Sequence, residues 1–393
     1  MKDINTEKKI SHINKLVQNI SRRIIQGEEV NLLVLHHNDL DGEAAYIVLQ
    51  HIIETEEEKY NNFHIQECEC LKNADDIEKI IVRYRDYFGY NVTDILIYDL
   101  SMNQDVSDVV EKIKNLKSIV MIDHHESAKS TSNKLWQLVI PHDETTLINN
   151  RTGSELAFDY YISRLIPIED EDQFSYYKQF MKLVSIYDSF SWNSAKFNEA
   201  IISHVSYFPS AFDKIVTFEA SCAIYNQTGK VAISECADKL NLLFKTLQLE
   251  AFREHVMSWM NKNSKLIDER VELIYQITKN NIKKAIESVE KHGKLFIVNK
   301  NNRLYVVHTC YTSMYQSEIG KYFYDKDNNI DIVFMVDMNS HSVSMRTNKE
   351  DINLAEIAKS LNGGGHPKAA GFQFDENMYQ LDDIVSLIGT ILY

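Results

Sequence analysis

Two kinds of apolar segment alternate along the first 140 residues. Runs such as "EEVNLLVLHH", "FHIQECE", "DILIYDLS" and "SIVMIDHH" are short, rich in aliphatic residues and typical of strands. Between them, "DGEAAYIVLQHIIE", "ADDIEKIIVRYRDYF" and "DVSDVVEKIKNL" repeat apolar residues at helical spacing. Strands that alternate with helices predict an α/β fold with a mostly parallel sheet flanked by helices.

The pattern changes twice further along the chain. From Gly153 to about Glu254 it is mostly helical, and residues 255–292 predict a long connecting helix or two. From Lys294 strand-like runs return, including "KLFIVNK", "RLYVVHTC", "DIVFMVDM" and "HSVSMRT". The sequence therefore predicts an N-terminal helix (1–27), a first domain (28–254), a helical linker (255–292) and a smaller C-terminal α/β domain (293–393).

Charge and hydropathy narrow the class of protein. The formal net charge is −15, and most of it lies before residue 291, which argues against a duplex-DNA binder because phosphate contacts need a basic surface. No apolar run is long enough for a transmembrane helix, so no membrane partner is expected. The N-terminal segment has no apolar signal-peptide core, and we expect a cytoplasmic protein.

Several apolar runs end abruptly on carboxylates or imidazoles. The carboxyl ends of parallel strands meet at one edge of a sheet, so these side chains are expected to converge. A single such break is also typical of a polar turn or a helix cap. The candidate residues are His37, Asp39 and Asp41 in "HHNDLDG", Asp99 in "YDLS", Asp123, His124 and His125 in "DHHES", and Asp188 in "YDSF".

This set of side chains indicates a metal site. Burying several carboxylates together is costly unless cations neutralise them. Mixed carboxylate and imidazole ligands suit manganese, iron, zinc or cobalt better than calcium. The residues exceed what one ion needs, and two metals that share a bridging carboxylate would use them all.

The C-terminal domain contains a candidate anion site in "NGGGHPKAAGF". Three glycines, Gly363, Gly364 and Gly365, let backbone N–H groups approach an anion, and His366 and Lys368 add positive charge. Arg346 follows "HSVSM", and its planar fork suits phosphate. The alternatives are a flexible turn and a surface arginine. The aromatic residues of "YTSMYQSEIGKYFY" could stack on bases or pack in the core.

These motifs resemble those of the DHH phosphoesterase superfamily. "HHNDLDG", "YDLS", "DHHES" and "YDSF" occur in the family's order, followed by "SMRT" and "GGGHPKAAGF". The resemblance spans roughly residues 30–390. It is best to the branch with a DHH-associated C-terminal domain, which includes RecJ-like nucleases, nanoRNases, pAp phosphatases and some cyclic-dinucleotide phosphodiesterases. It implies a metal-binding DHH domain followed by a substrate-binding domain, with an active-site cleft between the two.

The resemblance also implies roles for individual residues. His37 and Asp39 would bind one metal, Asp41, His124 and Asp188 the other, and Asp99 would bridge the two. His125 would face the scissile phosphate, and Asp123 would orient the imidazoles. Whether His36, the neighbour of His37, contributes stays open. Arg346, the three glycines, His366 and Lys368 would bind the substrate.

The function implied is that of a phosphodiesterase with two divalent metal ions, and Mn²⁺ is the ion expected. It would hydrolyse short single-stranded oligoribonucleotides to mononucleotides, in the 3′–5′ direction, with a metal-activated water. A pAp phosphatase or a phosphodiesterase of linear or cyclic dinucleotides is the nearest alternative. A RecJ-like single-strand exonuclease and an inactive nucleotide sensor are further alternatives. The chain is expected to be a monomer or a homodimer.

Overall fold

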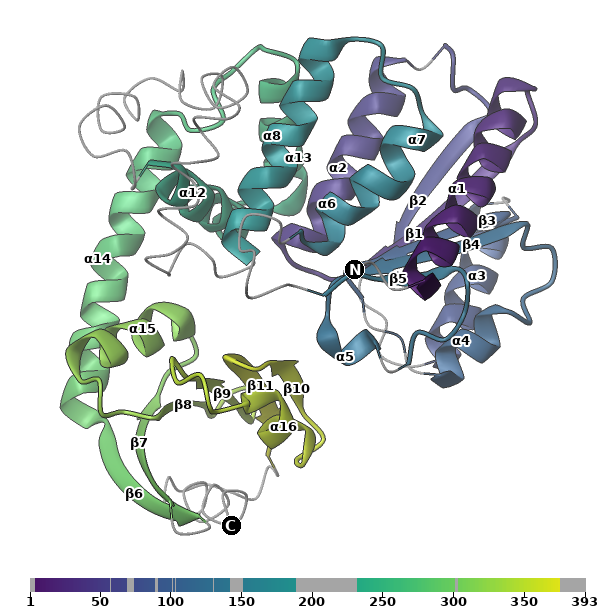
Figure 1. Ribbon diagram of the computed structural model, residues 1–393. Helices are drawn as coiled ribbons and strands as arrows, with labels where there is room; N and C mark the ends of the chain where they lie inside the picture. The colour runs from purple at the N-terminus through teal and green to yellow at the C-terminus, as the bar shows by residue number, and fades with distance from the viewer. Residues whose placement is uncertain are drawn as a thin grey trace. The chain divides into compact units, whose positions relative to one another are not determined.

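The computed structural model describes residues 4–56, 58–68, 74–88, 91–100, 102, 104–129, 131–141, 151–188, 232–300 and 303–374 (Figure 1). The chain divides into two compact units, Met1–Ile274 and Tyr275–Tyr393, called here the first and the second unit. The division falls within α14 (Glu269–His292), which follows α13 (Leu249–Met260). The finer domain boundaries stay a prediction.

The first unit is built on a five-stranded parallel sheet. Its order is β2-β1-β3-β4-β5, so the chain adds strands on one side of β1 and then on the other. The strands are β1 (Val30–His36), β2 (Phe63–Cys68), β3 (Asp94–Tyr98), β4 (Ser118–Asp123) and β5 (Gln137–Val139). This confirms the predicted parallel sheet. In such a sheet, ligands bind beyond the carboxyl ends of the strands, where the strand order reverses.

Helices cover both faces of this sheet (Figure 1). Leu32 and Val34 of β1 pack into one core, and Leu33 and Leu35 pack into the other, as the two-residue period of a strand requires. The core on the first face includes α1 (Ile4–Ile25), α2 (Leu40–Thr55), α6 (Gly153–Ala157), the π-helix η2 (Phe158–Ile162) and α7 (Ser163–Leu165). In the same core, α8 (Glu171–Asp188) and α13 pack against α2, and α12 (Ala232–Thr246) packs against α8. The second face carries α3 (Ala74–Phe88) and α4 (Gln104–Val110).

One predicted helix is shorter than its sequence pattern. Helical spacing continues to residue 116, but α4 ends at Val110. Glu111 is held by the indole N–H of Trp136 at 2.9 Å and by Lys134 at 2.7 Å, and the backbone turns at Asn115, whose φ is 71°. Contacts with a segment more than 20 residues away therefore override the local helical pattern.

The second unit contains a mixed six-stranded sheet in the order β10-β11-β9-β8-β7-β6. Its strands are β6 (Lys294–Lys300), β7 (Arg303–Tyr311), β8 (Ile332–Asp337), β9 (Ser342–Arg346), β10 (Gly364–His366) and β11 (Ala369–Gln373). One face packs against α16 (Leu354–Lys359), and the other packs against α14 and α15 (Gln316–Lys326). The smaller C-terminal α/β domain is thereby confirmed.

α15 was not predicted as a helix from its aromatic-rich sequence. Ile319 and Phe323 of α15 are buried in the core of the second unit, whereas Tyr311, just before it, is 43% exposed. Core packing thus accounts for part of this aromatic segment. Among the helices of the described ranges, none is both long and apolar enough to span a membrane.

A buried histidine lies under α15. His308 on β7 is 6% exposed, and its ring stacks on Phe323 with centroids 3.7 Å apart. A Cβ on Gly293, which ends α14, would lie 2.5 Å from His308 Cε1, so only glycine leaves room for the ring. Burial, assisted by the charge of Lys326, lowers the pKa of His308 to about 4.

This histidine should make the stability of the second unit depend on pH. The folded state binds the proton less readily than the unfolded state, whose histidine pKa is about 6.5, so stability is complete above that value and is lost as the pH falls toward 4. One pKa unit corresponds to about 1.4 kcal/mol, so we expect a loss of up to about 3 kcal/mol. His308→Phe keeps the stacked ring and should remove this part of the pH dependence.

The measurement is the urea unfolding free energy of the wild type and His308→Phe at several pH values between 7 and 4. Other titrating groups contribute equally to both proteins and cancel in the difference. Parallel pH curves for the two proteins would contradict the prediction.

Candidate metal centre

The register of the parallel sheet aligns three of the predicted motifs. His36, Tyr98 and Ile122 are neighbours across β1, β3 and β4. The residues that follow them are His37, Asp99 and Asp123. Asp99 also donates its backbone N–H to the carbonyl of Ile122 at 3.1 Å. Polar side chains that are up to 86 residues apart in sequence therefore meet at one edge of the sheet.

His124 lies at the middle of the carboxylates. Its Nε2 is 3.1 Å from Asp99 Oδ1, 3.6 Å from Asp188 Oδ2 and 3.9 Å from Asp41 Oδ2. The side chains of His124 and Asp41 are 1% exposed, that of Asp99 is 4% exposed and that of Asp188 is 27% exposed. Most of this cluster is thus shielded from water.

The described residues contain three groups whose potential ligand atoms lie within 4.8 Å of one another. They are His37–Asp39–Asp99, Asp41–His124–Asp188 and Asp99–Asp123–His124–His125. The first group contains His37, Asp39 and the bridging Asp99 of one implied metal site. The second contains Asp41, His124 and Asp188 of the other site but not Asp99, which belongs to the first and the third groups. Their roles as ligands stay a prediction, taken up under the proposed function.

The first group is the more exposed of the three. The side chains of His37 and Asp39 are 49% and 42% exposed, and His37 Nδ1 is 2.7 Å from Asp39 Oδ2. Asp39 is also the N-cap of α2, because its Oδ1 accepts the backbone N–H of Gly42 at 2.9 Å. Asp39 therefore caps α2, as the alternative reading of a helix cap expects, and it also lies beside His37 and Asp99.

His36 differs from His37 in its surroundings. Its ring is buried and stacks on Tyr98 with centroids 5.5 Å apart, and its Nδ1 is 2.8 Å from the carbonyl oxygen of His37. His36 is absent from the three groups found among the described residues. It supports the backbone of His37 from within the core.

Asp123 holds the imidazole of His125. Its Oδ1 is 2.7 Å from His125 Nδ1 and also accepts the backbone N–H of His124 at 2.8 Å. Burial acts to lower the pKa of His125, but the hydrogen bond to Asp123 and the nearby carboxylates raise it to about 9. Without a cation the ring is therefore an imidazolium at neutral pH, placed at the rim of the cluster.

The electrostatics of the cluster fit a bound cation. Burial, followed by the charge of Asp41, raises the pKa of both Asp99 and Asp188 well above the usual range of a carboxyl. Asp188 Oδ2 is buried and accepts no hydrogen bond from the described residues. The buried oxygen and the disfavoured negative charge are both satisfied by a divalent cation bound to oxygen and imidazole ligands.

The structure adds residues that the sequence did not single out. Tyr98 donates its hydroxyl to the carbonyl of Gly42 at 2.5 Å, and a Cβ on Gly42 would lie 1.9 Å from the carbonyl oxygen of His37. Gly153 and Ser154, at the start of α6, contact Asp41. Thr152 and Ser154 are residue types that mark where a helix begins, but such a pattern does not indicate what the N–H groups of the helix touch.

In the second unit, the glycine-rich motif forms a hairpin. β10 and β11 are joined by Pro367 and Lys368, and Gly365 has a φ of 133°, which favours glycine. A Cβ on Gly363 would lie 2.1 Å from the carbonyl oxygen of Gly371, so this glycine permits close approach of two chain segments. Lys368 donates to the carbonyl of Lys349.

Arg346 and His366 lie in one row across the second sheet. Arg346 pairs with Ala369, and Ala369 pairs with His366, so both side chains project from the same face, two strands apart. Arg346 Nη2 is 3.4 Å from Ser317 Oγ, and a Cβ on Gly320 would lie 2.9 Å from Arg346 Cγ. The missing side chain at Gly320 lets Arg346 lie along α15.

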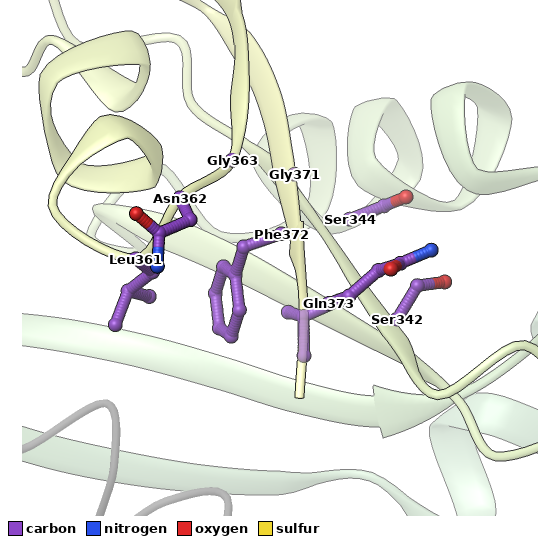
Figure 2. A pocket seen from close by; sticks show the side chains of 9 residues that line it. Ser342, Ser344, Leu361, Asn362, Gly363, Gly371, Phe372 and Gln373 are labelled. Atoms are coloured by element: carbon purple, nitrogen blue, oxygen red, sulfur yellow. The ribbon is translucent and has the colours of Figure 1, made fainter. Parts of the chain in front are cut away.

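A pocket of about 470 Å³ lies beside this row, at the end of β11 (Figure 2). Ser342, Ser344 and Gln373 point to one side of the strand, and Phe372 points to the other, toward Leu361 and Asn362. Ser342, Ser344 and Arg346 occupy every second position of β9, so their side chains share one face of the sheet. The predicted substrate-binding residues and this polar pocket therefore belong to one sheet.

The described residues define an α/β protein with a cluster of carboxylates and imidazoles that could hold metal ions in the first unit and a polar sheet face in the second. Residues 305–392 match the model of the DHHA1 domain. The chain is also 22% identical over 354 residues to the oligoribonuclease NrnB of Bacillus subtilis (strain 168), which covers 88% of this chain and 73% of that protein.

Solved structures with some likeness include an uncharacterized protein from Helicobacter pylori G27, with a TM-score of 0.35 and 17% identity over 93% of this chain and 99% of that one. An exopolyphosphatase-related protein from Bacteroides fragilis has a TM-score of 0.44 and 15% identity over 98% of this chain and 96% of that one.

Together with the motifs, the domain match and the similarity to NrnB support the DHH superfamily with a DHH-associated C-terminal domain. This confirms the family resemblance drawn from the sequence. The same findings support a hydrolase.

The contact between Gly42 and His37 yields a testable consequence. Gly42→Ala would place a methyl group on the carbonyl oxygen of His37, so either the start of α2 or the end of β1 must shift. Overpacking of this kind costs roughly 1–3 kcal/mol of unfolding free energy. Gly364→Ala is the matched control, because a Cβ there meets no atom within 4 Å. Thermal unfolding should show a clear loss for Gly42→Ala alone, and equal unfolding temperatures for the two variants would contradict the geometry.

Proposed function

We propose that the protein is a manganese-dependent phosphodiesterase that hydrolyses short single-stranded oligoribonucleotides to mononucleotides in the 3′–5′ direction. The observation that carries the proposal is the convergence of Asp41, Asp99 and Asp188 on His124 at the edge of a parallel sheet. The name of its relative, an oligoribonuclease, supports the substrate class. The acidic net charge of −15 supports a short substrate over a long polyanion.

Two divalent cations would be held by the two groups around the bridging carboxylate. His37 and Asp39 would hold one, Asp41, His124 and Asp188 the other, and Asp99 both. When bound, such cations acidify water and offset the negative charge that develops on a phosphoryl group during hydrolysis. Imidazole and carboxylate donors together favour manganese over calcium.

His125 and Asp123 would supply a hydrogen bond to the substrate and fix its direction. With its Nδ1 held by Asp123, His125 would donate a hydrogen bond from Nε2 to a phosphoryl oxygen. The hydrogen bond to Asp123 raises the pKa of the imidazole, which favours a cationic donor in this role. Asp123 would hold the ring in its orientation and favour the doubly protonated form, the only form in which Nε2 can donate while Nδ1 bonds to Asp123.

The second unit would bind the end of the substrate. Arg346 and His366 project from one face of its sheet and would contact a phosphate, with the backbone N–H groups of the glycine hairpin nearby. The pocket beside them, lined by Ser342, Ser344 and Gln373, has hydroxyl and amide groups that suit a sugar or a base. Its volume of about 470 Å³ is in the range of small-molecule sites.

Removal of divalent metal is the first test of this function. The purified chain in excess chelator should not hydrolyse 5′-labelled di- to pentaribonucleotides, and Mn²⁺ should restore activity better than Mg²⁺ or Ca²⁺. The same assay with pAp, linear and cyclic dinucleotides and a long RNA ranks the substrate classes. Full turnover in chelator would contradict the metal mechanism, and faster digestion of the long RNA would contradict the preference for short substrates.

The second test asks whether the second unit binds the substrate while the first unit carries out the hydrolysis. Arg346→Ala removes one charged phosphate contact, which typically costs about 1.5–3 kcal/mol. The KM for a short oligonucleotide should therefore rise about ten- to a hundred-fold. Hydrolysis of bis-p-nitrophenyl phosphate should change little, because this small ester lacks the nucleotide that Arg346 would bind.

Two control variants make the second test specific. Lys321→Ala removes a part-exposed cation of α15 that lies 3.7 Å from Asp325, and should leave both reactions unchanged. Asp99→Ala should abolish both reactions. If Arg346→Ala lost the small-ester reaction as completely as Asp99→Ala, with its fold intact by circular dichroism, the assignment of Arg346 to substrate binding would be wrong.

A further inference from the structure

The start of α6 reaches the metal centre from a part of the sequence that carries none of the metal motifs. Asp41 Oδ2 accepts the backbone N–H of Gly153 at 2.8 Å. Asp41 Oδ1 accepts the backbone N–H of Ser154 at 3.3 Å and also its hydroxyl. Three donors thus hold a carboxylate that is 2% exposed, and all three come from residues more than 110 positions away.

The same segment also fits against Asp99. A Cβ on Gly153 would lie 2.5 Å from Asp99 Cβ and 2.7 Å from its Cα. Asp99 has a φ of 52°, a left-handed conformation that non-glycine residues rarely adopt. The absent side chain of Gly153 leaves the space into which the bent backbone of Asp99 packs.

Further hydrogen bonds connect this segment to the helix that carries Asp188. The backbone N–H of Thr152 donates to Ser185 Oγ at 3.1 Å, and the Ser185 hydroxyl donates to Glu155. Ser185 lies three residues before Asp188 on α8, on the adjacent turn. One short segment, residues 152–155, therefore contacts Asp41 and Asp99 directly and the helix of Asp188 through Ser185.

The two predicted metal groups differ in how firmly they are held. His37 and Asp39 are about half exposed and bond to each other. Asp41, in contrast, is buried and held in one orientation by its three donors. A ligand that is already oriented binds a cation without losing conformational freedom, and hydrogen-bond partners of ligands typically account for ten- to a hundred-fold in metal affinity.

We propose that Ser154 is a positioning residue of the metal centre, which orients Asp41 and thereby sets the Mn²⁺ affinity of the Asp41–His124–Asp188 group. This inference rests on the proposed function, because it takes that group as one of two metal sites. Ser154 acts through Asp41 and does not touch the cation or the substrate. Its effect is therefore selective for one of the two binding events.

The test is a calorimetric titration of the metal-free full-length chain with Mn²⁺. The wild type should bind two ions, and Ser154→Ala should weaken one binding event about ten- to a hundred-fold while the other keeps its affinity. Ser118→Ala is the matched control, because Ser118 Oγ donates to a buried carboxylate, Asp94, at 2.6 Å in the same unit but outside the centre. This control should keep both wild-type affinities.

A second measurement separates loss of metal from loss of fold. The unfolding temperatures of the metal-free proteins report the fold, and the rise on adding Mn²⁺ reports binding. On adding Mn²⁺, the unfolding temperature of Ser154→Ala should rise less than that of Ser118→Ala, whatever the stability of either metal-free protein. Wild-type affinity at both events in Ser154→Ala, or equal weakening in Ser118→Ala, would overturn the inference. A wild-type chain that binds no Mn²⁺ would instead overturn the proposed function on which it rests.

Discussion

The repulsion between carboxylates gathered in a buried space is the constraint on which the first unit depends. Asp41, Asp99 and Asp123 are at most 3% exposed, and burial with neighbouring charge raises the pKa of Asp99. Such a cluster would separate if its members were free to move. It is held because each carboxylate is fixed by the backbone: at the end of a strand, at the start of a helix, or by N–H groups from α6.

The parallel sheet is what makes this gathering possible. Parallel strands present their carboxyl ends at one edge of the sheet. In the order β2-β1-β3-β4-β5 the direction in which strands are added reverses beside β1, and ligands bind at such a point. Close packing at Gly42 and Gly153 then brings backbone against backbone. These two glycines are structural requirements of the centre, although neither has a side chain to offer it.

The sheet of the second unit places two basic side chains on one of its faces. Antiparallel register across β9, β11 and β10 places Arg346 and His366 on one face, and Gly320 leaves the space in which Arg346 lies along α15. Ser342 and Ser344 lie on the same face of β9 as Arg346 and extend this polar face to the pocket at the end of β11. An anion and a neighbouring polar group could thus be recognised by the same sheet.

The sequence by itself indicated strands β1 to β4 and β6 to β9, the parallel arrangement of the first sheet, and the acidic or imidazole residues that follow its strands. It did not predict β10 and β11, which form in the glycine motif. These features are local: a strand has a two-residue period, and its end is marked by the residue that breaks the apolar run. The sequence also indicated Arg346 and the glycine motif, since anion binding needs recognisable residue types.

Only the tertiary structure decided which groups these residues touch. The contact of Ser154 with Asp41, the burial of His36 against Tyr98, the early end of α4 and the helix α15 all depend on partners distant in sequence or on the packing of a core. A helix cap in the sequence shows where N–H groups are exposed, but their acceptor is set by packing. Residues 153 and 41 meet because α6 and α2 cover the same face of the sheet, which no local pattern encodes.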